Sequence, residues 1–247
     1  MVELGRIYIA VEVSQISSFL SIPRQGHLVN ALHIMSYLKI KHNPRLVLDP
    51  RYTGIYMSEF NSNENWAPFY GDVQEAKPLN APKSLVKEVT LHMFVYSDHA
   101  GDKIDCRSRT GFMIFMNMAM TKWHTKKQAT VEGAVFGAKC LAMKQCVETL
   151  RGIRFKVRMM GINIEVPTYV YGDNMSVIYN TSKPESVLKK KSNSICYNFL
   201  REAAAMKECL TTHVPTETNW ADLLTKVLFG NKKPELVQGV LFDIYDY

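Results

Sequence analysis

Three aspartates occupy comparable positions in the chain, and their side chains could do chemistry together. Asp98 and Asp173 each come directly after a short apolar segment that favours a strand, and Asp222 lies in NWADLL, in the first turn of a predicted helix. Ligands gather at the ends of strands in α/β sheets. Carboxylates that converge on one point repel each other unless a divalent cation neutralises them, and Mg²⁺ with its octahedral oxygen shell is the usual cation. Two such ions support in-line displacement at a phosphodiester.

Each aspartate taken alone has a simpler interpretation. An aspartate at the end of a strand is commonly a turn residue or a helix cap. The prediction of a metal site formed by Asp98, Asp173 and Asp222 therefore depends on all three occurring in order within one fold.

The elements that would position these aspartates lie in residues 90–229. Apolar patterns separated by short polar turns predict three strands, at residues 90–97, 110–117 and 119–126. A predicted helix at 135–150 is followed by a basic stretch, RGIRFKVRMMG. The remaining predicted elements are a strand at 168–172, helices at 174–182 and 192–208, a strand at 210–214 and a final helix at 218–228. This order predicts an α/β domain with a mixed sheet and helices packed against it.

The flanking regions have other characters. Residues 1–42 favour two helices, the first from Ile7 to Leu20 and the second with apolar side chains at helical spacing from Leu28 to Leu38. Residues 43–89 contain five prolines and no sustained period, which is typical of an irregular connection. Residues 230–247 are expected to form a C-terminal tail.

Composition narrows the class of protein. In 247 residues no run of 18 apolar side chains occurs, so no membrane span is predicted, and the first residues lack a signal-peptide pattern. Five scattered cysteines without metal-binding spacing favour free thiols in a reducing compartment. The expected location is therefore intracellular, in the cytoplasm or the nucleus.

The net charge of +7 favours a polyanionic partner. Clustered basic side chains could contact phosphates without sequence preference. A solvated helix face is the alternative for the arginines, and a mobile loop is the alternative for the three consecutive lysines. The candidate nucleic-acid-binding residues are Lys126, Lys127, Arg151, Arg154, Lys189, Lys190 and Lys191.

Several stretches together resemble the C-terminal part of a copia-type retrotransposon reverse transcriptase, namely the end of its thumb followed by its ribonuclease H domain. They occur in family order over most of residues 2–229. The resemblance implies a ribonuclease H-like fold: a mixed five-stranded sheet flanked by helices, preceded by an N-terminal helical hairpin. The metal-binding palm is absent from this chain, so the remainder of the reverse transcriptase is an expected missing partner. The matching stretches are ELGRIYIAVEVSQISSFLSIPRQGHLVNALHIMSYLK, YSDHAGDKIDCRSRTGFMIF, TKWHTKKQATVE, YGDNMSVIYNTS and ADLLTKVL.

The resemblance implies an active site of four carboxylates that hold Mg²⁺ or Mn²⁺. Asp98 matches the first carboxylate, Asp173 the third and Asp222 the fourth. The second is a glutamate on the first helix of the domain, and Lys139 stands at its position. Glu132 is about 10 Å away along a helix, at 1.5 Å per residue, and is too far to replace it. We therefore expect weakened metal binding and an ion pair from Lys139 to Asp98 or Asp173.

The function implied is that of a two-metal nuclease acting on RNA–DNA hybrids, within a fragment of a Pol polyprotein, with catalysis impaired by Lys139. Two alternatives remain at this point. The chain could be a non-catalytic nucleic-acid-binding module, or a relic without function.

Overall fold

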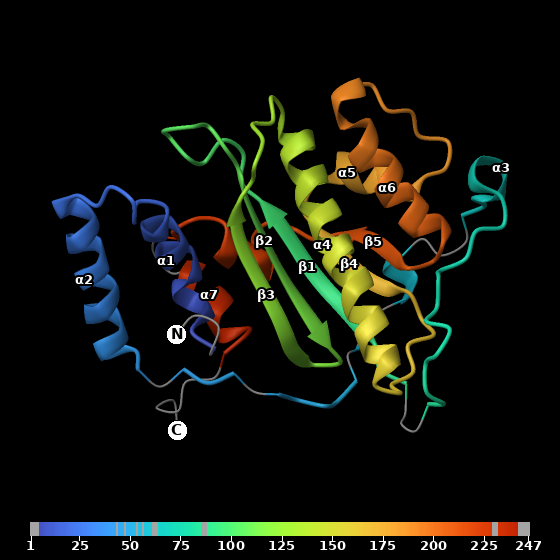
Figure 1. Ribbon diagram of the computed structural model, residues 1–247, viewed down its shortest axis with the longest axis horizontal. Helices are drawn as coiled ribbons and strands as arrows, with labels where there is room; N and C mark the ends of the chain where they lie inside the picture. Colours follow the sequence, from blue (N-terminus) through green and yellow to red (C-terminus); the bar gives the residue numbers. More distant parts are fainter. Residues whose placement is uncertain are drawn as a thin grey trace.

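The computed structural model describes residues 5–42, 44–46, 48–52, 54–55, 57–60, 64–84, 88–228 and 232–241. A five-stranded sheet in the order β3-β2-β1-β4-β5 forms its centre (Figure 1). The first three strands are antiparallel, and β4 and β5 run parallel to β1. The strands are β1 (Leu91–Ser97), β2 (Arg109–Met116), β3 (Ala119–Lys127), β4 (Thr168–Gly172) and β5 (Cys209–His213). The predicted mixed sheet is confirmed.

The central strands are apolar over most of their length because both faces of the sheet are covered. In β2, Phe112 and Ile114 pack into one hydrophobic core, while Met113 and Phe115 pack into a second core on the opposite face. Successive strand side chains point to opposite faces, so a continuous apolar run indicates burial on both sides.

Helices cover the two faces unequally. The first face carries the long helix α4 (Val135–Met159), together with α5 (Met175–Ser182) and α6 (Ser194–Ala205) (Figure 1). The second face is covered by two short α-helices and two 3₁₀ turns: α1 (Ala10–Ser17), α7 (Lys232–Gln238), η2 (Ile7–Ile9) and η5 (Trp220–Leu224). The region 230–247, expected as a tail, thus contributes Leu236, Val240 and Leu241 to the second core.

Helix α4 is nine residues longer than the pattern predicted, because the basic stretch after Leu150 continues it. Val157 is buried in the first core, which holds this part of the helix against the sheet. The chain leaves the helix at Gly161, whose φ of 76° suits glycine far better than other residues. The predicted end of this helix at Leu150 was wrong.

The predicted final helix at 218–228 is instead the 3₁₀ turn η5. The side chain of Asn219 accepts a hydrogen bond from the Ala221 amide at 3.0 Å and starts the turn. A Cβ atom at Gly111 of β2 would lie 2.8 Å from Leu224 and Thr225 side-chain atoms, so glycine allows η5 to approach the sheet. This close packing places Asp222 against β1 and β2.

The two helices of the N-terminal hairpin are buried to different extents. Helix α1 contributes Ala10 to the second core, whereas α2 (Gln25–Ile40) has no fully buried residue and packs against this core through the partly buried Ile34 and Leu38. Helix α2 lies to one side of the sheet (Figure 1). Leu28, Leu32 and Met35 of α2 are each more than half exposed. None of the described helices is both long and apolar enough to cross a membrane.

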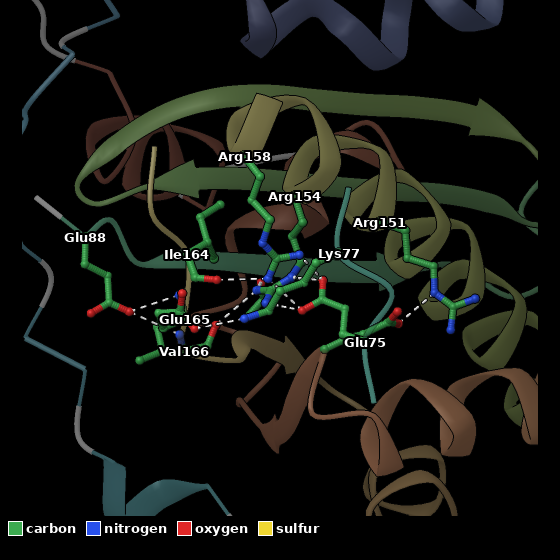
Figure 2. A network of polar contacts seen from close by, with 11 residues as sticks. Glu75, Lys77, Glu88, Arg151, Arg154, Arg158, Ile164, Glu165 and Val166 are labelled. Carbon is green, nitrogen blue, oxygen red and sulfur yellow. Dashed lines mark hydrogen bonds and ion pairs between the residues drawn. The ribbon is translucent and has the colours of Figure 1, made fainter. Parts of the chain in front are cut away.

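The connection before β1 includes η3 (Met57–Glu59) and α3 (Ala67–Tyr70) and is attached to α4 by a buried ion-pair network (Figure 2). Glu75 accepts paired hydrogen bonds from Arg154, both at 2.7 Å, and from Arg158 at 2.6 and 2.7 Å. The two guanidinium groups also donate to backbone carbonyls of Ile164 and Val166. The connection is therefore irregular in backbone but specifically anchored.

Candidate functional site

Lys139 and Asp173 form an ion pair where α4 meets the end of β4. The Lys139 Nζ donates to both carboxylate oxygens of Asp173, at 2.7 and 2.6 Å. Both side chains are largely buried, with 13% and 6% of their surfaces exposed. The Thr216 hydroxyl adds a hydrogen bond to Asp173 at 3.2 Å. The expected ion pair of Lys139 with an aspartate of the site is present.

Tyr96, the penultimate residue of β1, lies between two lysines. The Lys139 Nζ is 4.0 Å from the centroid of its ring, and the Lys226 Nζ is 5.1 Å from it. Lys226 also donates to the Tyr96 hydroxyl at 3.3 Å. Burial, followed by the nearby charge of Asp222, raises the pKa of Tyr96, so this phenol stays neutral. Its ring is a cation–π platform for both ammonium groups.

Asp222 is fully buried and is held by two cations. Its carboxylate forms ion pairs with Lys226 at 3.0 Å and with Lys232 of α7 at 2.8 Å. The Thr225 hydroxyl lies 3.3 Å from the same carboxylate. Through these contacts the Asp222 carboxylate links η5 to α7.

Asp98 follows β1 and turns back toward its own loop. Its carboxylate accepts a hydrogen bond from the backbone amide of Arg109, and its Oδ2 lies over Gly101, where a Cβ would leave it no room. Burial raises the pKa of Asp98, although that hydrogen bond and the charges of Arg109, Lys226 and Lys139 oppose the shift. Asp98 is therefore near both lysines of the site without pairing with either.

The three predicted metal ligands lie at the same end of the sheet, because β1 and β4 are parallel neighbours and η5 packs against β1 and β2. They are nonetheless not gathered into one metal site. Among the described residues, no three His, Cys, Asp or Glu side chains are arranged to hold a metal ion. The Lys139 ammonium binds both carboxylate oxygens of Asp173. Lys226 and Lys232 neutralise the carboxylate of Asp222. The residues present do not fit a two-metal centre.

Two acidic residues near Lys139 in the sequence, Glu132 and Glu148, do not supply the missing carboxylate ligand. Glu132 precedes α4 and contacts Asn193 and Thr130 instead of the aspartates. Glu148 pairs with Lys144 one helical turn away on α4. Among the described side chains of α4, Lys139 is therefore the one that contacts the Asp173 carboxylate.

A double-mutant cycle is expected to find strong coupling between Lys139 and Asp173. Lys139→Met or Asp173→Asn leaves a partner largely buried without its counter-charge, so we expect a coupling free energy of about 1–3 kcal/mol from denaturant unfolding. The more exposed pair Lys144–Glu148 on the same helix is the control, with a coupling of about 0.3–0.5 kcal/mol. Equal couplings in the two cycles would contradict the buried pair.

The structure separates the predicted nucleic-acid-binding residues into two groups. Arg154 was predicted wrongly as a surface contact: its side chain is 1% exposed and is bound to Glu75. Arg151 pairs with Glu208 at 2.7 Å, and Lys127 pairs with Asp102 and Asp105, both at 2.8 Å. Acidic residues that are distant in the sequence fold against these three cations and form ion pairs with them. The exposed members of the set are Lys126, Lys189, Lys190 and Lys191.

The sequence motifs did not indicate Tyr96 or Lys226 as site residues. Lys226 stands four residues after Asp222, a spacing that brings side chains together on a helix and could have suggested the pair. Nothing in the sequence indicated that the Tyr96 ring would lie between the two lysines, since Lys139 comes from a distant helix.

Curated relatives place the chain among transposon proteins. It is 24% identical over 220 residues, 89% of its length, to the retrovirus-related Pol polyprotein from transposon RE1 of Arabidopsis thaliana. It is 27% identical over 140 residues to the corresponding protein from transposon RE2, and 24% identical over 142 residues to that from transposon TNT 1-94 of Nicotiana tabacum. The chain spans only 10–13% of the length of these relatives. No protein-family model matches it.

Among solved structures, the chain is similar to ribonuclease H domains at low identity. The N-terminal domain of Rv2228c from Mycobacterium tuberculosis aligns at 13% identity with a TM-score of 0.43, over 61% of this chain and 98% of that one. LC11-RNase H1 in complex with an RNA/DNA hybrid aligns at 13% identity with a TM-score of 0.45, over 55% and 94%. The curated relatives confirm the resemblance seen in the sequence motifs: this chain is a homologue of a segment of the retrovirus-related Pol polyproteins of copia-type transposons.

Proposed function

We propose that this chain carries a ribonuclease H-like domain that binds RNA–DNA hybrids and is impaired in cleaving them. The observation that carries the proposal is the Lys139 ammonium on both oxygens of Asp173, at 2.7 and 2.6 Å. The resemblance assigns a glutamate to the position of Lys139, so a cation stands where an anionic ligand would be needed.

Electrostatics oppose a divalent ion at this place. At an effective dielectric of about 20, two unit charges 4 Å apart interact by roughly 4 kcal/mol, and a divalent ion doubles that repulsion from an ammonium. An ion could bind only after Lys139 left Asp173, which would also break a largely buried pair. The two lysines on Asp222 add a second barrier of the same kind.

Binding of nucleic acid is supported by the exposed lysines. Lys126 at the end of β3, and Lys189, Lys190 and Lys191 before α6, have no carboxylate within 4 Å among the described residues. Ammonium groups of this kind can replace counterions along a phosphate backbone without reading its sequence. The net charge of +7 has the sign that such a role requires.

The remainder of the reverse transcriptase is the proposed partner of helix α2. Leu28, Leu32 and Met35 present an apolar face to solvent. Exposed apolar surface gathered on one helix is typical of an interaction site. The curated relatives, which are several times longer than the matched segment, contain further chain that could cover it.

The unmodified chain is expected to bind a labelled RNA–DNA hybrid and to leave it intact. Fluorescence anisotropy should give an affinity that falls steeply with salt, with a slope of about −3 to −4 in a log–log plot if four lysines contact phosphates. Gel analysis with Mg²⁺ or Mn²⁺ should show cleavage close to the protein-free background.

A matched pair of variants tests the lysines. Replacing Lys189, Lys190 and Lys191 by alanine should reduce the salt slope by about 3, whereas Lys207→Ala at the opposite end of the sheet should leave it unchanged. The proposal fails if the hybrid does not bind at low ionic strength, or if the unmodified chain cleaves it rapidly when metal is added.

A further inference from the structure

A cavity of about 380 Å³ lies beside Asp98, between the end of α1 and the loop that joins β1 to β2. Ser18 and Phe19 line it from the side of the N-terminal hairpin, and Lys226 lines it from the segment after η5. The hairpin and the ribonuclease H-like domain therefore build this cavity together. Its volume falls within the range of small-molecule binding sites.

Arg109 supplies a buried cation to this cavity. It is 6% exposed, and its Nη1 donates a hydrogen bond to the Ser14 hydroxyl of α1 at 2.6 Å. No carboxylate of the described part of the chain lies within 4 Å of its guanidinium group, in contrast to Arg154 and Arg158, which share Glu75. Burial lowers the pKa of Arg109, yet an arginine side chain remains charged in proteins. The charges of Asp98 and Asp102 oppose this shift from beyond ion-pair distance. The buried guanidinium group is therefore only partly compensated, which is costly.

The remaining charges around the cavity are mostly paired with each other. Lys127 is engaged by Asp102 and Asp105, and Lys226 is engaged by Asp222. Lys103 at the rim is exposed and has no carboxylate within 4 Å among the described residues. Arg109 and Lys103 are thus two cations at the cavity without an ion-pair partner among the described residues. The carboxylate of Asp98 is the one described anionic group there that is not in an ion pair.

We propose that this cavity binds a phosphate group, with Arg109 as the buried anchor and Lys103 at the rim. The planar guanidinium carries five N–H donors in a fork that matches phosphate oxygens, and the structure uses one of them on Ser14. Asp98 keeps its carboxylate on the Arg109 amide and the loop at Gly101. The inference rests on the proposed function, because a nucleic-acid strand that passes the end of β1 brings phosphates to this opening.

The test measures binding in a buffer with EDTA, so that it is independent of cleavage. The probes are a fluorescein-labelled RNA–DNA hybrid, followed by anisotropy, and inorganic phosphate, followed by calorimetry. Arg109→Gln should weaken hybrid binding about tenfold, as expected for a lost charged hydrogen bond. Lys103→Glu should weaken it about threefold, whereas Lys207→Glu, with the same change of charge at the far end of the sheet, should have a smaller effect.

Each outcome decides the proposal. Weakened hybrid binding with unaltered phosphate binding assigns the cavity to a backbone phosphate, and loss of both assigns it to free phosphate as well. Arg109→Gln with unchanged affinity for both probes overturns it. If that variant does not fold, equal effects of Lys103→Glu and Lys207→Glu overturn it.

The proposed function can fail separately from this site. Rapid cleavage by the unmodified chain with metal would overturn impaired catalysis and leave the cavity result unchanged. If the hybrid does not bind at all, binding of inorganic phosphate that Arg109→Gln or Lys103→Glu weakens, and Lys207→Glu does not, would still establish the cavity. Absence of phosphate binding in that case would overturn it.

Discussion

Replacing Glu75 by alanine is expected to lower the free energy of unfolding by about 3–5 kcal/mol. Glu75 neutralises Arg154 and Arg158, whose side chains are 1% and 9% exposed, through hydrogen bonds of 2.6–2.7 Å (Figure 2). Without it, two buried guanidinium groups keep only their hydrogen bonds to backbone carbonyls and to Thr168. Urea unfolding of the whole chain measures the loss.

Glu165→Ala is the matched control for this substitution. Glu165 pairs with Lys77 of the same connection at 3.2 Å, but both side chains are more than half exposed. Its removal should cost less than about 1 kcal/mol. A loss for Glu75→Ala as small as that of the control would show that the network does not anchor the connection.

The contribution of Glu75 should also depend on pH. Burial alone would raise its pKa, but the hydrogen bonds and charges of Arg154 and Arg158 outweigh burial and lower the pKa from 4.5 to about 2. A carboxyl group with a depressed pKa in the folded state stabilises the fold fully above its unfolded pKa and loses this effect as the pH falls toward the folded value. The stability difference between the unmodified chain and Glu75→Gln should therefore be constant above about pH 5 and shrink between pH 5 and 2.

Lys139→Glu is expected to raise cleavage of an RNA–DNA hybrid in Mg²⁺ or Mn²⁺ by about tenfold or more over the unmodified chain. The substitution changes the local charge by two units. An activation barrier that is lower by only about 1.4 kcal/mol makes the reaction ten times faster. Recovery should be partial, because Asp222 remains paired with Lys226 and Lys232. Single-turnover assays with excess protein measure the chemical step.

Thermal unfolding gives a second measurement that does not depend on activity. In EDTA, Lys139→Glu should be less stable than the unmodified chain, because a glutamate would face Asp173. Mn²⁺ should stabilise the variant by about 2.7 kcal/mol at 100 times its dissociation constant, and should leave the unmodified chain and Lys139→Met unchanged. A folded variant that neither gains stability from Mn²⁺ nor cleaves would contradict the proposal that Lys139 impairs the site.

Local sequence patterns predict the order of the strands and of helix α4, and they place most site residues along that order. The strands before Asp98 and Asp173 and the helix that carries Lys139 follow from local apolar patterns, which depend on neighbours a few residues apart. Because β1 and β4 are parallel, the residues after both strands meet at one end of the sheet. The pairing of Lys139 with an aspartate was expected from the family resemblance, which places Lys139 at the position of a carboxylate ligand.

Which charges form ion pairs depends on the packing of segments that are distant in the sequence. Asp222 faces Lys232 of α7, and Arg154 is buried against Glu75, 79 residues away. The same holds for Arg109, which packs beside Ser14 of the N-terminal hairpin and has no carboxylate within 4 Å of its guanidinium group in the described part of the chain. Periodicity reports which face of an element is apolar, but an ion pair depends on which distant segments come within about 4 Å of each other. The sequence alone therefore does not distinguish the cations that form ion pairs from those that do not.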